Sequence, residues 1–173
     1  MSRRTAVVVP VPEAEPVVAR WRSRFDASAA AGMPAHVTAL FPFVAAHDAV
    51  VAELSALCAA LPPLAVQFRR CARFPGVVVY LAPEPADGLR HLTEAIVARW
   101  PEAPPYEGRF DDIVPHLTVA DGVDEEVAGE IEAALRPSLP IRARLVGACL
   151  YELDGSRWRC LSEFPFRGRT AAG

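Results

Sequence analysis

Two short stretches, PAHVTALFPF at residues 34–43 and VPHLTVA at residues 114–120, decide the fold that this sequence predicts. Each contains a histidine followed two positions later by a threonine: His36 and Thr38 in the first, His116 and Thr118 in the second. The apolar character of both stretches and the turn signals around them predict β-strands. Along a strand, residues i and i+2 point to one face and the residue between them points to the other. Each stretch therefore presents an imidazole and a hydroxyl together on one face and buries an apolar side chain on the other.

The two stretches belong to an internal repeat. Four pairs of positions have separations of 78 to 80 residues: His36 with His116, Leu61-Pro62 with Leu139-Pro140, Cys71 with Cys149, and Gly76 with Gly155. Separations this similar, in the same order as the secondary-structure signals, indicate two structurally equivalent lobes. We expect a single domain over residues 1–173 with approximate internal repeats 5–75 and 76–165, because 173 residues is close to the length of one domain.

Hydrophobic periodicity predicts the other elements. The expected strands cover residues 5–11, 36–43, 64–71, 77–82, 115–120, 141–150 and 157–164, the last two forming a closing hairpin. The expected helices begin at Pro16, at an Asp48 cap, before Leu89 and at an Asp124 cap, while residues 27–34 form a loop. Arg20, Arg22 and Arg24 are expected on the solvent side of the first helix. The pattern predicts an α+β, bilobal fold: two pseudo-twofold-related lobes of antiparallel sheet, with outer helices and an active-site cleft between the lobes.

If the lobes pack about a pseudo-twofold axis, His36 and His116 face each other across one gap, each beside a threonine. Imidazole has an unperturbed pKa of about 6.5, so one ring can accept a proton while the other donates one. Threonine hydroxyls can donate hydrogen bonds to non-bridging phosphate oxygens. In-line displacement at phosphorus uses these parts: a base, an acid and donors to the equatorial oxygens. We therefore interpret His36, Thr38, His116 and Thr118 as catalytic residues, with both threonines also binding substrate.

A single His-x-Thr has little weight as a motif, because a histidine on a strand is commonly structural. The sequence itself provides an example, since His91-Leu92-Thr93 falls inside the third predicted helix, where residues i and i+2 diverge. We interpret His91 as a solvated helix residue and His47 as structural. The symmetric placement in equivalent strands distinguishes His36 and His116 from these two.

The two stretches resemble the paired signatures of the two-histidine phosphoesterase superfamily, which includes bacterial 2′-5′ RNA ligases and RNA 2′,3′-cyclic phosphodiesterases. The family pattern is His, apolar, Thr or Ser, apolar, given twice about 80 residues apart. The resemblance covers nearly the whole chain, with Ala39 standing where the family more often has a larger apolar residue. It implies that His36, Thr38, His116 and Thr118 form the active site.

Arginine and aromatic residues offer further contacts to a nucleotide. Arg109 and Phe110, in the loop before the second motif, could supply a phosphate clamp and a base-stacking ring, so we include both as substrate-binding candidates. Phe110 could equally belong to the core. The pairs Arg142/Arg144 and Arg157/Arg159 each share a strand face; they could contact phosphates, although a solvated sheet face explains them more simply.

Composition excludes several mechanisms. All 18 basic residues are arginine, so Schiff-base chemistry, a lysine-ended phosphate loop and a nucleotidyl-lysine intermediate are excluded. No second ligand at helical spacing accompanies the histidines, including at Asp111-Asp112, so we expect no metal and no cofactor.

The four cysteines form no C-x-x-C pair, no apolar run reaches 18 residues, and the apolar stretch after Met1 is too short for a signal peptide. We expect a cytoplasmic protein with reduced thiols, no membrane association and no stable protein partner, compatible with a monomer.

The expected function is metal-independent hydrolysis of 2′,3′-cyclic phosphates, on RNA 3′ ends or small nucleotides, to 2′-phosphates. Reversible 2′-5′ RNA ligation stays open, because a hydroxyl can replace water in the same step. Two alternatives also stay open: a small-molecule cyclic phosphodiesterase of the ADP-ribose cyclic phosphate type, and a non-catalytic nucleotide- or RNA-binding module.

Overall fold

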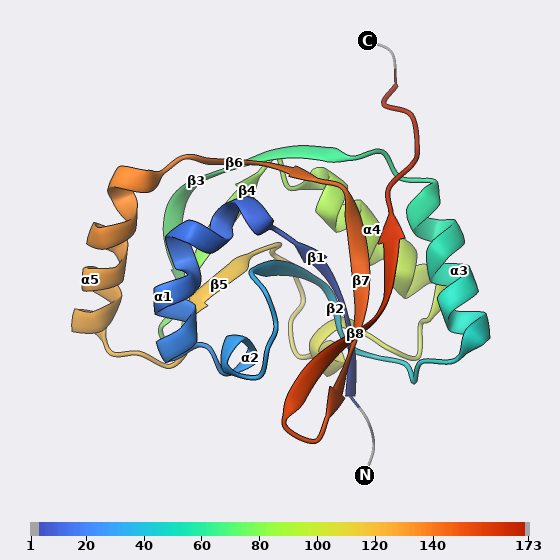
Figure 1. Ribbon diagram of the computed structural model, residues 1–173, viewed down its shortest axis with the longest axis horizontal. Helices are drawn as coiled ribbons and strands as arrows, with labels where there is room; N and C mark the ends of the chain where they lie inside the picture. The colour runs from blue at the N-terminus through green and yellow to red at the C-terminus, as the bar shows by residue number, and fades with distance from the viewer. Residues whose placement is uncertain (1–3, 172–173) are drawn as a thin grey trace.

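Two four-stranded antiparallel sheets form the framework of the computed structural model, which describes residues 4–171 (Figure 1). Sheet A has the strand order β2-β1-β7-β8, from His36–Phe43, Arg4–Pro10, Gly147–Asp154 and Arg157–Pro165. Sheet B has the order β5-β4-β3-β6, from Leu117–Ala120, Val78–Glu84, Leu64–Phe74 and Ile141–Leu145. Every neighbouring pair of strands is antiparallel, which confirms the predicted fold class.

The strand orders of the two sheets correspond position by position, β2 with β5, β1 with β4, β7 with β3, and β8 with β6. However, neither sheet is built from one half of the sequence alone. Strand β3, from the first half, pairs with β4 and β6 in sheet B, and β7, from the second half, pairs with β1 in sheet A. The first predicted repeat thus contributes β3 to sheet B, and the second contributes β7 and β8 to sheet A. Each sheet contains strands from both halves of the chain.

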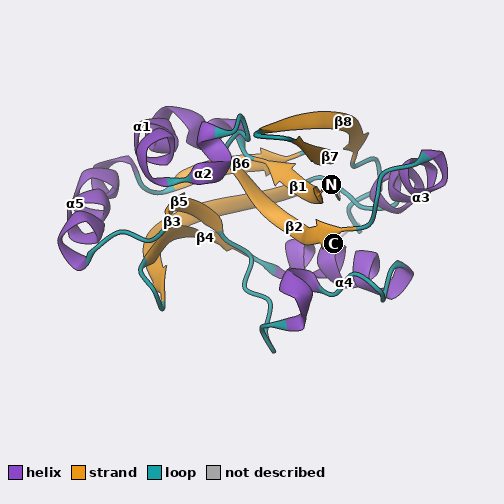
Figure 2. Ribbon diagram, turned by 90° about the horizontal axis from the view of Figure 1, so that it is seen from below, coloured by secondary structure: helices purple, strands orange, loops and turns teal. Residues whose placement is uncertain are grey.

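Within residues 4–171, five α-helices and three short 3₁₀ helices join these strands. The α-helices are α1 (Glu15–Phe25), α2 (Ala27–Ala30), α3 (Asp48–Ala59), α4 (Asp87–Arg99) and α5 (Glu125–Leu135). The 3₁₀ helices are η1 (Pro12–Ala14), η2 (Pro105–Gly108) and η3 (Arg136–Ser138). Figure 2 shows α1 and α5 at one end of the molecule and α3 and α4 at the other. None of the helices in the described part of the chain has the length and apolarity needed to cross a bilayer.

One continuous hydrophobic core runs through both sheets and under the helices. It takes alternate residues from the strands, such as Val7 and Val9 of β1 and Val37 of β2, together with helix residues such as Leu92 and Ile96. The intervening strand residues lie on the opposite face of each sheet. In sheet A, this face carries a second, smaller apolar cluster of Ala6, Val8, Met33 and Cys149. We call the face of each sheet opposite the core its site face, because it carries His36 and Thr38 in sheet A and Thr118 in sheet B.

The prediction of one strand over residues 141–150 is wrong. Val146, which is 59% exposed, separates β6 from β7, and the two strands enter different sheets. The chain crosses at Gly147, where a Cβ atom would lie 2.7 Å from the Phe164 carbonyl oxygen, so only glycine fits without displacing backbone. Periodicity did not reveal the crossing because both strands bury apolar residues in the same core. The closing hairpin is therefore β7–β8, with Asp154 paired to Arg157.

Two local predictions are also corrected. Residues 27–34, expected as a loop, contain the short helix α2, because the Asp26 side chain accepts a hydrogen bond from the Ser28 amide at 2.9 Å. The N-cap of α3 is His47 and not Asp48, and no side-chain hydrogen bond caps that helix. The predicted Asp124 cap of α5 is confirmed, since its carboxylate accepts from the Val127 amide at 2.8 Å.

Candidate active site

The two His-x-Thr motifs lie at the line where the two sheets meet. His36 begins β2, and His116 lies directly before β5, which contains Thr118. Val37 and Leu117 are 1% and 0% exposed, so alternation turns the histidines and threonines to the site face, where all four are half-buried. The edge strands β2 and β5 contact each other across the sheets. The structure therefore brings together the two motifs, as the sequence predicted.

The two histidines have the same hydrogen-bond arrangement. His36 Nδ1 lies 2.7 Å from the carbonyl oxygen of Pro34, and His116 Nδ1 lies 2.7 Å from that of Val114. A carbonyl oxygen can only accept, so each Nδ1 must carry the hydrogen. In the neutral ring, Nε2 then has a free lone pair. Both imidazoles are consequently fixed in the tautomer that can accept a proton at Nε2, and a charged ring can donate one there.

Burial lowers the pKa of both histidines. The pKa of His36 falls to about 4, mainly through burial and also through the nearby charges of Arg22 and His116, against the opposing effects of the Pro34 carbonyl and Asp26. The pKa of His116 is lowered by burial and raised by its bond to Val114. In the free protein both rings are therefore neutral at pH 7. A nearby anion would raise the pKa of either ring and favour its protonated form.

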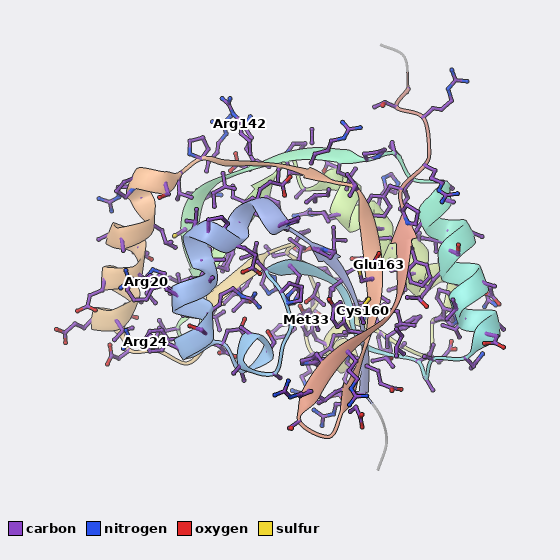
Figure 3. The ribbon with its side chains drawn as sticks, in the orientation of Figure 1. Arg20, Arg24, Met33, Arg142, Cys160 and Glu163 are labelled. Carbon is purple, nitrogen blue, oxygen red and sulfur yellow. The ribbon has the colours of Figure 1, made fainter. Side chains whose placement is uncertain are left out.

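A buried arginine lies next to His36. Arg22 is 2% exposed; its Nη2 donates to Asp26 Oδ2 at 3.0 Å and its Nη1 donates to the Met33 carbonyl at 3.4 Å. The prediction that Arg22 faces solvent is wrong, whereas Arg20 and Arg24 do point outward from α1 (Figure 3). The Arg22/Asp26 spacing of i, i+4 is a signal of a helical ion pair, but it does not reveal burial.

An aromatic pair lies beside His116. The Phe74 and Tyr80 rings are stacked at 4.1 Å between centroids, and both meet the His116 ring edge-on, at 4.9 and 5.6 Å. Tyr80 is directly opposite Thr118 in the sheet. On the site face of sheet A, the rings of Phe41 and Trp158 also meet edge-on, at 6.0 Å. The sequence pattern did not reveal the role of these four rings, because strand aromatics are usually assigned to the core.

Tyr106, in the loop before the second motif, also belongs to the surroundings of the site, because its hydroxyl interacts with Thr38. Burial raises the pKa of Tyr106, and the interaction of its hydroxyl with the Thr38 side chain lowers it. The Tyr106 ring meets Phe110 edge-on at 5.7 Å. Phe110 is 64% exposed, so it does not belong to the core, and Arg109 is exposed and paired with Glu107 at 2.6 Å. Phe110 thus borders the site through Tyr106, whereas substrate binding by Arg109 and Phe110 stays a prediction.

The other arginine candidates are distributed over both sheets. Arg142 and Arg144 lie on β6 of sheet B, while Arg157 and Arg159 lie on β8 of sheet A, so they do not form one hairpin surface. All four are exposed, and Arg159 pairs with Asp154 at 3.3 Å. A hollow between α1 and the loop before α5, lined by Asp26 and Asp121 among others, includes neither site histidine. We therefore take the paired motifs, and not this hollow, as the candidate site.

Residues 9–157 match the sequence model of the 2′-5′ RNA ligase superfamily. Among solved structures, the chain is similar to Escherichia coli LigT complexed with 3′-AMP, with 18% identity over 95% of this chain and 98% of that one and a TM-score of 0.64. It is also similar to the protein TT0787 of Thermus thermophilus, with 19% identity over 96% and 100% of the two chains and a TM-score of 0.64. A protein described as a phosphoesterase matches at 16% identity over 96% and 99%, with a TM-score of 0.59. The search of curated proteins found no match.

These structural similarities show a shared fold over nearly the whole length of each chain. The family model covers well over half of this chain and includes both His-x-Thr motifs. The resemblance to two-histidine phosphoesterases that the motifs suggested is confirmed. The chain belongs to the 2′-5′ RNA ligase superfamily, whose members are phosphoesterase- or ligase-type enzymes.

Proposed function

We propose that the protein hydrolyses 2′,3′-cyclic phosphates on RNA 3′ ends or nucleotides to 2′-phosphates, with the two histidines as acid and base. The observation that carries the proposal is the matched pair of imidazoles, each bonded through Nδ1 to a backbone carbonyl two residues earlier. This arrangement leaves both Nε2 atoms for proton transfer. Each histidine also has a threonine two residues later on the same face.

The reaction needs one proton acceptor and one proton donor. Water attacks phosphorus while Nε2 of one histidine accepts its proton. The bond between phosphorus and O3′ breaks, and the second histidine, as imidazolium, donates a proton from Nε2 to O3′. The Thr38 and Thr118 hydroxyls donate to the non-bridging oxygens, where negative charge develops. The products are a 2′-phosphate and a free 3′-hydroxyl.

Aromatic rings on both site faces favour a nucleotide or RNA end as the substrate. Phe74 and Tyr80 contact His116 in sheet B, and Phe41 and Trp158 pack against the apolar cluster on the site face of sheet A. Unpaired bases are commonly bound by stacking on such rings. ADP-ribose cyclic phosphate also carries a base, an adenine that can stack on these rings, so it is the second candidate.

Reversible 2′-5′ joining requires no additional group, because a 5′-hydroxyl would replace water in the same displacement. The chain has no lysine to carry a nucleotidyl group. Any joining must therefore take its free energy from the strained cyclic phosphate.

The test is a panel of 2′,3′-cyclic mononucleotides, short oligonucleotides with a cyclic phosphate end, and ADP-ribose cyclic phosphate, each with and without EDTA. We expect EDTA-resistant formation of 2′-phosphates from the nucleotide substrates. His36→Ala and His116→Ala should each lower turnover by about a hundredfold or more, and Thr38→Val or Thr118→Val by roughly ten- to a thousandfold.

His91→Ala is the matched control, because His91 also precedes a threonine by two positions but is exposed on α4. It should leave turnover within a few-fold of wild type. EDTA-sensitive activity restored by a divalent ion would overturn the metal-independent mechanism. Ligand binding without turnover, unaffected by loss of either site histidine, would favour the non-catalytic binding module.

A further inference from the structure

A group of two thiols and one carboxylate lies on the site face of sheet A, outside the acid–base site. The two Sγ atoms and a carboxylate oxygen of Cys149, Cys160 and Glu163 all lie within 4.8 Å of one another. Cys149 is 7% exposed, whereas Cys160 and Glu163 are exposed on β8, where Figure 3 labels them. We propose that Cys149, Cys160 and Glu163 bind a thiophilic divalent cation of the Zn²⁺ class.

An irregularity in the sheet creates this cluster. Cys160 and Glu163 are three residues apart, so regular alternation would turn them to opposite faces. In the pairing of β7 with β8, Tyr151 is opposite Cys160 but Leu150 is opposite Ser162, so Leu161 is an extra residue in β8. Such a bulge reverses the face of the sheet to which the side chains beyond it point. Both ligands consequently face the same way as Cys149, which pairs directly with Glu163.

The donor set favours a borderline-soft ion. Zn²⁺ prefers thiolate and carboxylate ligands in tetrahedral arrangement, with bonds of about 2.3 Å to sulfur and about 2.0–2.2 Å to oxygen. These bond lengths put neighbouring ligand atoms about 3.5–3.8 Å apart, which small rotamer changes can reach from the observed spacing. Mg²⁺ and Ca²⁺ prefer oxygen ligands alone and do not match two thiols.

A tetrahedral ion held by these three groups has one further ligand position. Because Cys160 and Glu163 are exposed, the fourth ligand position faces solvent and would hold water or an anionic group.

A disulfide is the competing use of the two thiols. Cys149 and Cys160 are diagonal neighbours, because Cys160 is opposite Tyr151. Diagonal neighbours across an antiparallel pair are commonly about 7–8 Å apart at Cα, beyond the separation that a disulfide ordinarily spans. A metal ion with two bonds to sulfur bridges a wider gap, so this geometry favours metal binding.

The cluster is separate from the acid–base site. Cys149 pairs with Val8, and Val8 pairs with Thr38, so two strand spacings of about 4.8 Å separate the cluster from the nearest catalytic threonine. Loss of Cys160 should therefore leave hydrolysis of a cyclic mononucleotide in EDTA unchanged. This separation makes failure of the metal site distinguishable from failure of the proposed function.

The experiment titrates Co²⁺ into the reduced, chelator-treated full-length protein and then displaces it with Zn²⁺. We expect one Co²⁺ per chain, with the absorption of a tetrahedral site and a thiolate-to-cobalt charge-transfer band that Zn²⁺ removes. Cys160→Ser should weaken binding by more than about a hundredfold, because loss of an outer-shell partner alone costs 10–100-fold. Glu163→Gln should weaken binding while keeping the charge-transfer band.

Cys71→Ser is the matched control, since Cys71 is a partly buried thiol on β3, the strand of sheet B that corresponds to β7. It should bind Co²⁺ as the wild type does. Circular dichroism checks that each variant folds. Absence of the charge-transfer band, or equal loss in the Cys71 and Cys160 variants, would overturn the proposal. So would a Cys149–Cys160 disulfide formed under mild oxidation by a protein that binds no Co²⁺.

Discussion

At the scale of single residues, the proposed acid and base roles of the two histidines predict a pH dependence of the rate. The base must be neutral, so the rate falls when pH drops through its pKa; the acid must be protonated, so the rate falls when pH rises through its pKa. The pKa of His36 is about 4, and that of His116 is also lowered from 6.5. Because kcat/KM reports the free enzyme, we expect its maximum on the acidic side of pH 6.5.

Bound phosphate should move the profile of kcat to higher pH, because an anion near an imidazolium raises its pKa. The two limbs belong to the coupled pair and not to one named histidine. Measuring kcat and kcat/KM from about pH 4 to 9 tests this expectation. His91→Ala should leave both profiles unchanged, and a maximum of kcat/KM above pH 7 would contradict the lowered pKa values.

Tyr106 gives a second residue-scale prediction. Its hydroxyl interacts with the side chain of Thr38, which we propose as a donor to the phosphate. Tyr106→Phe removes one hydrogen bond, whose net contribution is about 1 kcal/mol, so kcat/KM should fall about fivefold. The shape of the pH profile should not change, because Tyr106 is not a titrating group in the reaction.

Tyr151→Phe is the matched control for Tyr106→Phe, because Tyr151 packs against the apolar cluster that contains Cys149 and lies on the same site face. It should leave kcat/KM within twofold of wild type, since no catalytic hydroxyl depends on it. Equal losses in the two variants would mean that the Tyr106 hydroxyl has no particular role in positioning Thr38.

The sequence revealed some of these residues and concealed others for physical reasons. His36, Thr38, His116 and Thr118 were predictable because strand alternation fixes the face of each side chain. Tyr106 was not, because its place depends on a loop in which Tyr106 and Glu107 have φ angles of 50° and 58°. Arg22 was concealed because helical periodicity does not show that α2 and the Met33 backbone cover that side of α1.

At the scale of elements, helix caps separate what sequence patterns predict from what the structure shows. Asp48 and Asp124 both precede an apolar stripe, and both were predicted as caps. Only Asp124 stands in the N-cap position and accepts a hydrogen bond from the third helical residue. Asp48 is itself the first residue of α3. The one-residue difference depends on the backbone conformation of His47, which propensity alone does not determine.

This difference leads to a prediction about stability. Asp124→Ala should lower the free energy of unfolding by about 1 kcal/mol, because it leaves the Val127 amide without its side-chain acceptor. Asp48→Ala should cost only about 0.3–1 kcal/mol, the helix-dipole effect of an acidic residue in the first turn. Urea denaturation of both variants measures the two losses in the free energy of unfolding. A larger loss for Asp48→Ala would contradict the assignment of the caps.

The strands also separate what the sequence pattern predicts from what it does not predict. The alternation of residues 36–43 predicted β2 with its correct bounds, because one face is buried in the core and the other carries the site. The break between β6 and β7 was not predictable, because the apolar pattern on either side of Val146 faces one shared core. Periodicity reports which residues are buried, and it does not report which sheet buries them.

At the scale of the whole molecule, the placement of β3 in sheet B and of β7 and β8 in sheet A couples the two sheets. Sheet A needs β7 from the second half of the chain, and sheet B needs β3 from the first half. One core cluster also includes residues of both sheets, such as Leu150 of β7 and Phe68 of β3. Neither sheet can lose its strands without exposing the core of the other.

We therefore expect the molecule to unfold in one cooperative transition. Trp158 is in sheet A, and Tyr80, near the His116 site, is in sheet B. Urea unfolding should give coincident midpoints for the Trp158 fluorescence, taken as wild type minus Trp158→Phe, and for the near-ultraviolet circular dichroism of Tyr80, taken as wild type minus Tyr80→Phe. Far-ultraviolet circular dichroism should give the same midpoint. A fragment of residues 1–75 should not fold alone, because β3 would lack both β4 and β6. Two separated transitions, or a folded fragment, would mean that the lobes are independent although each sheet contains strands from both halves of the chain.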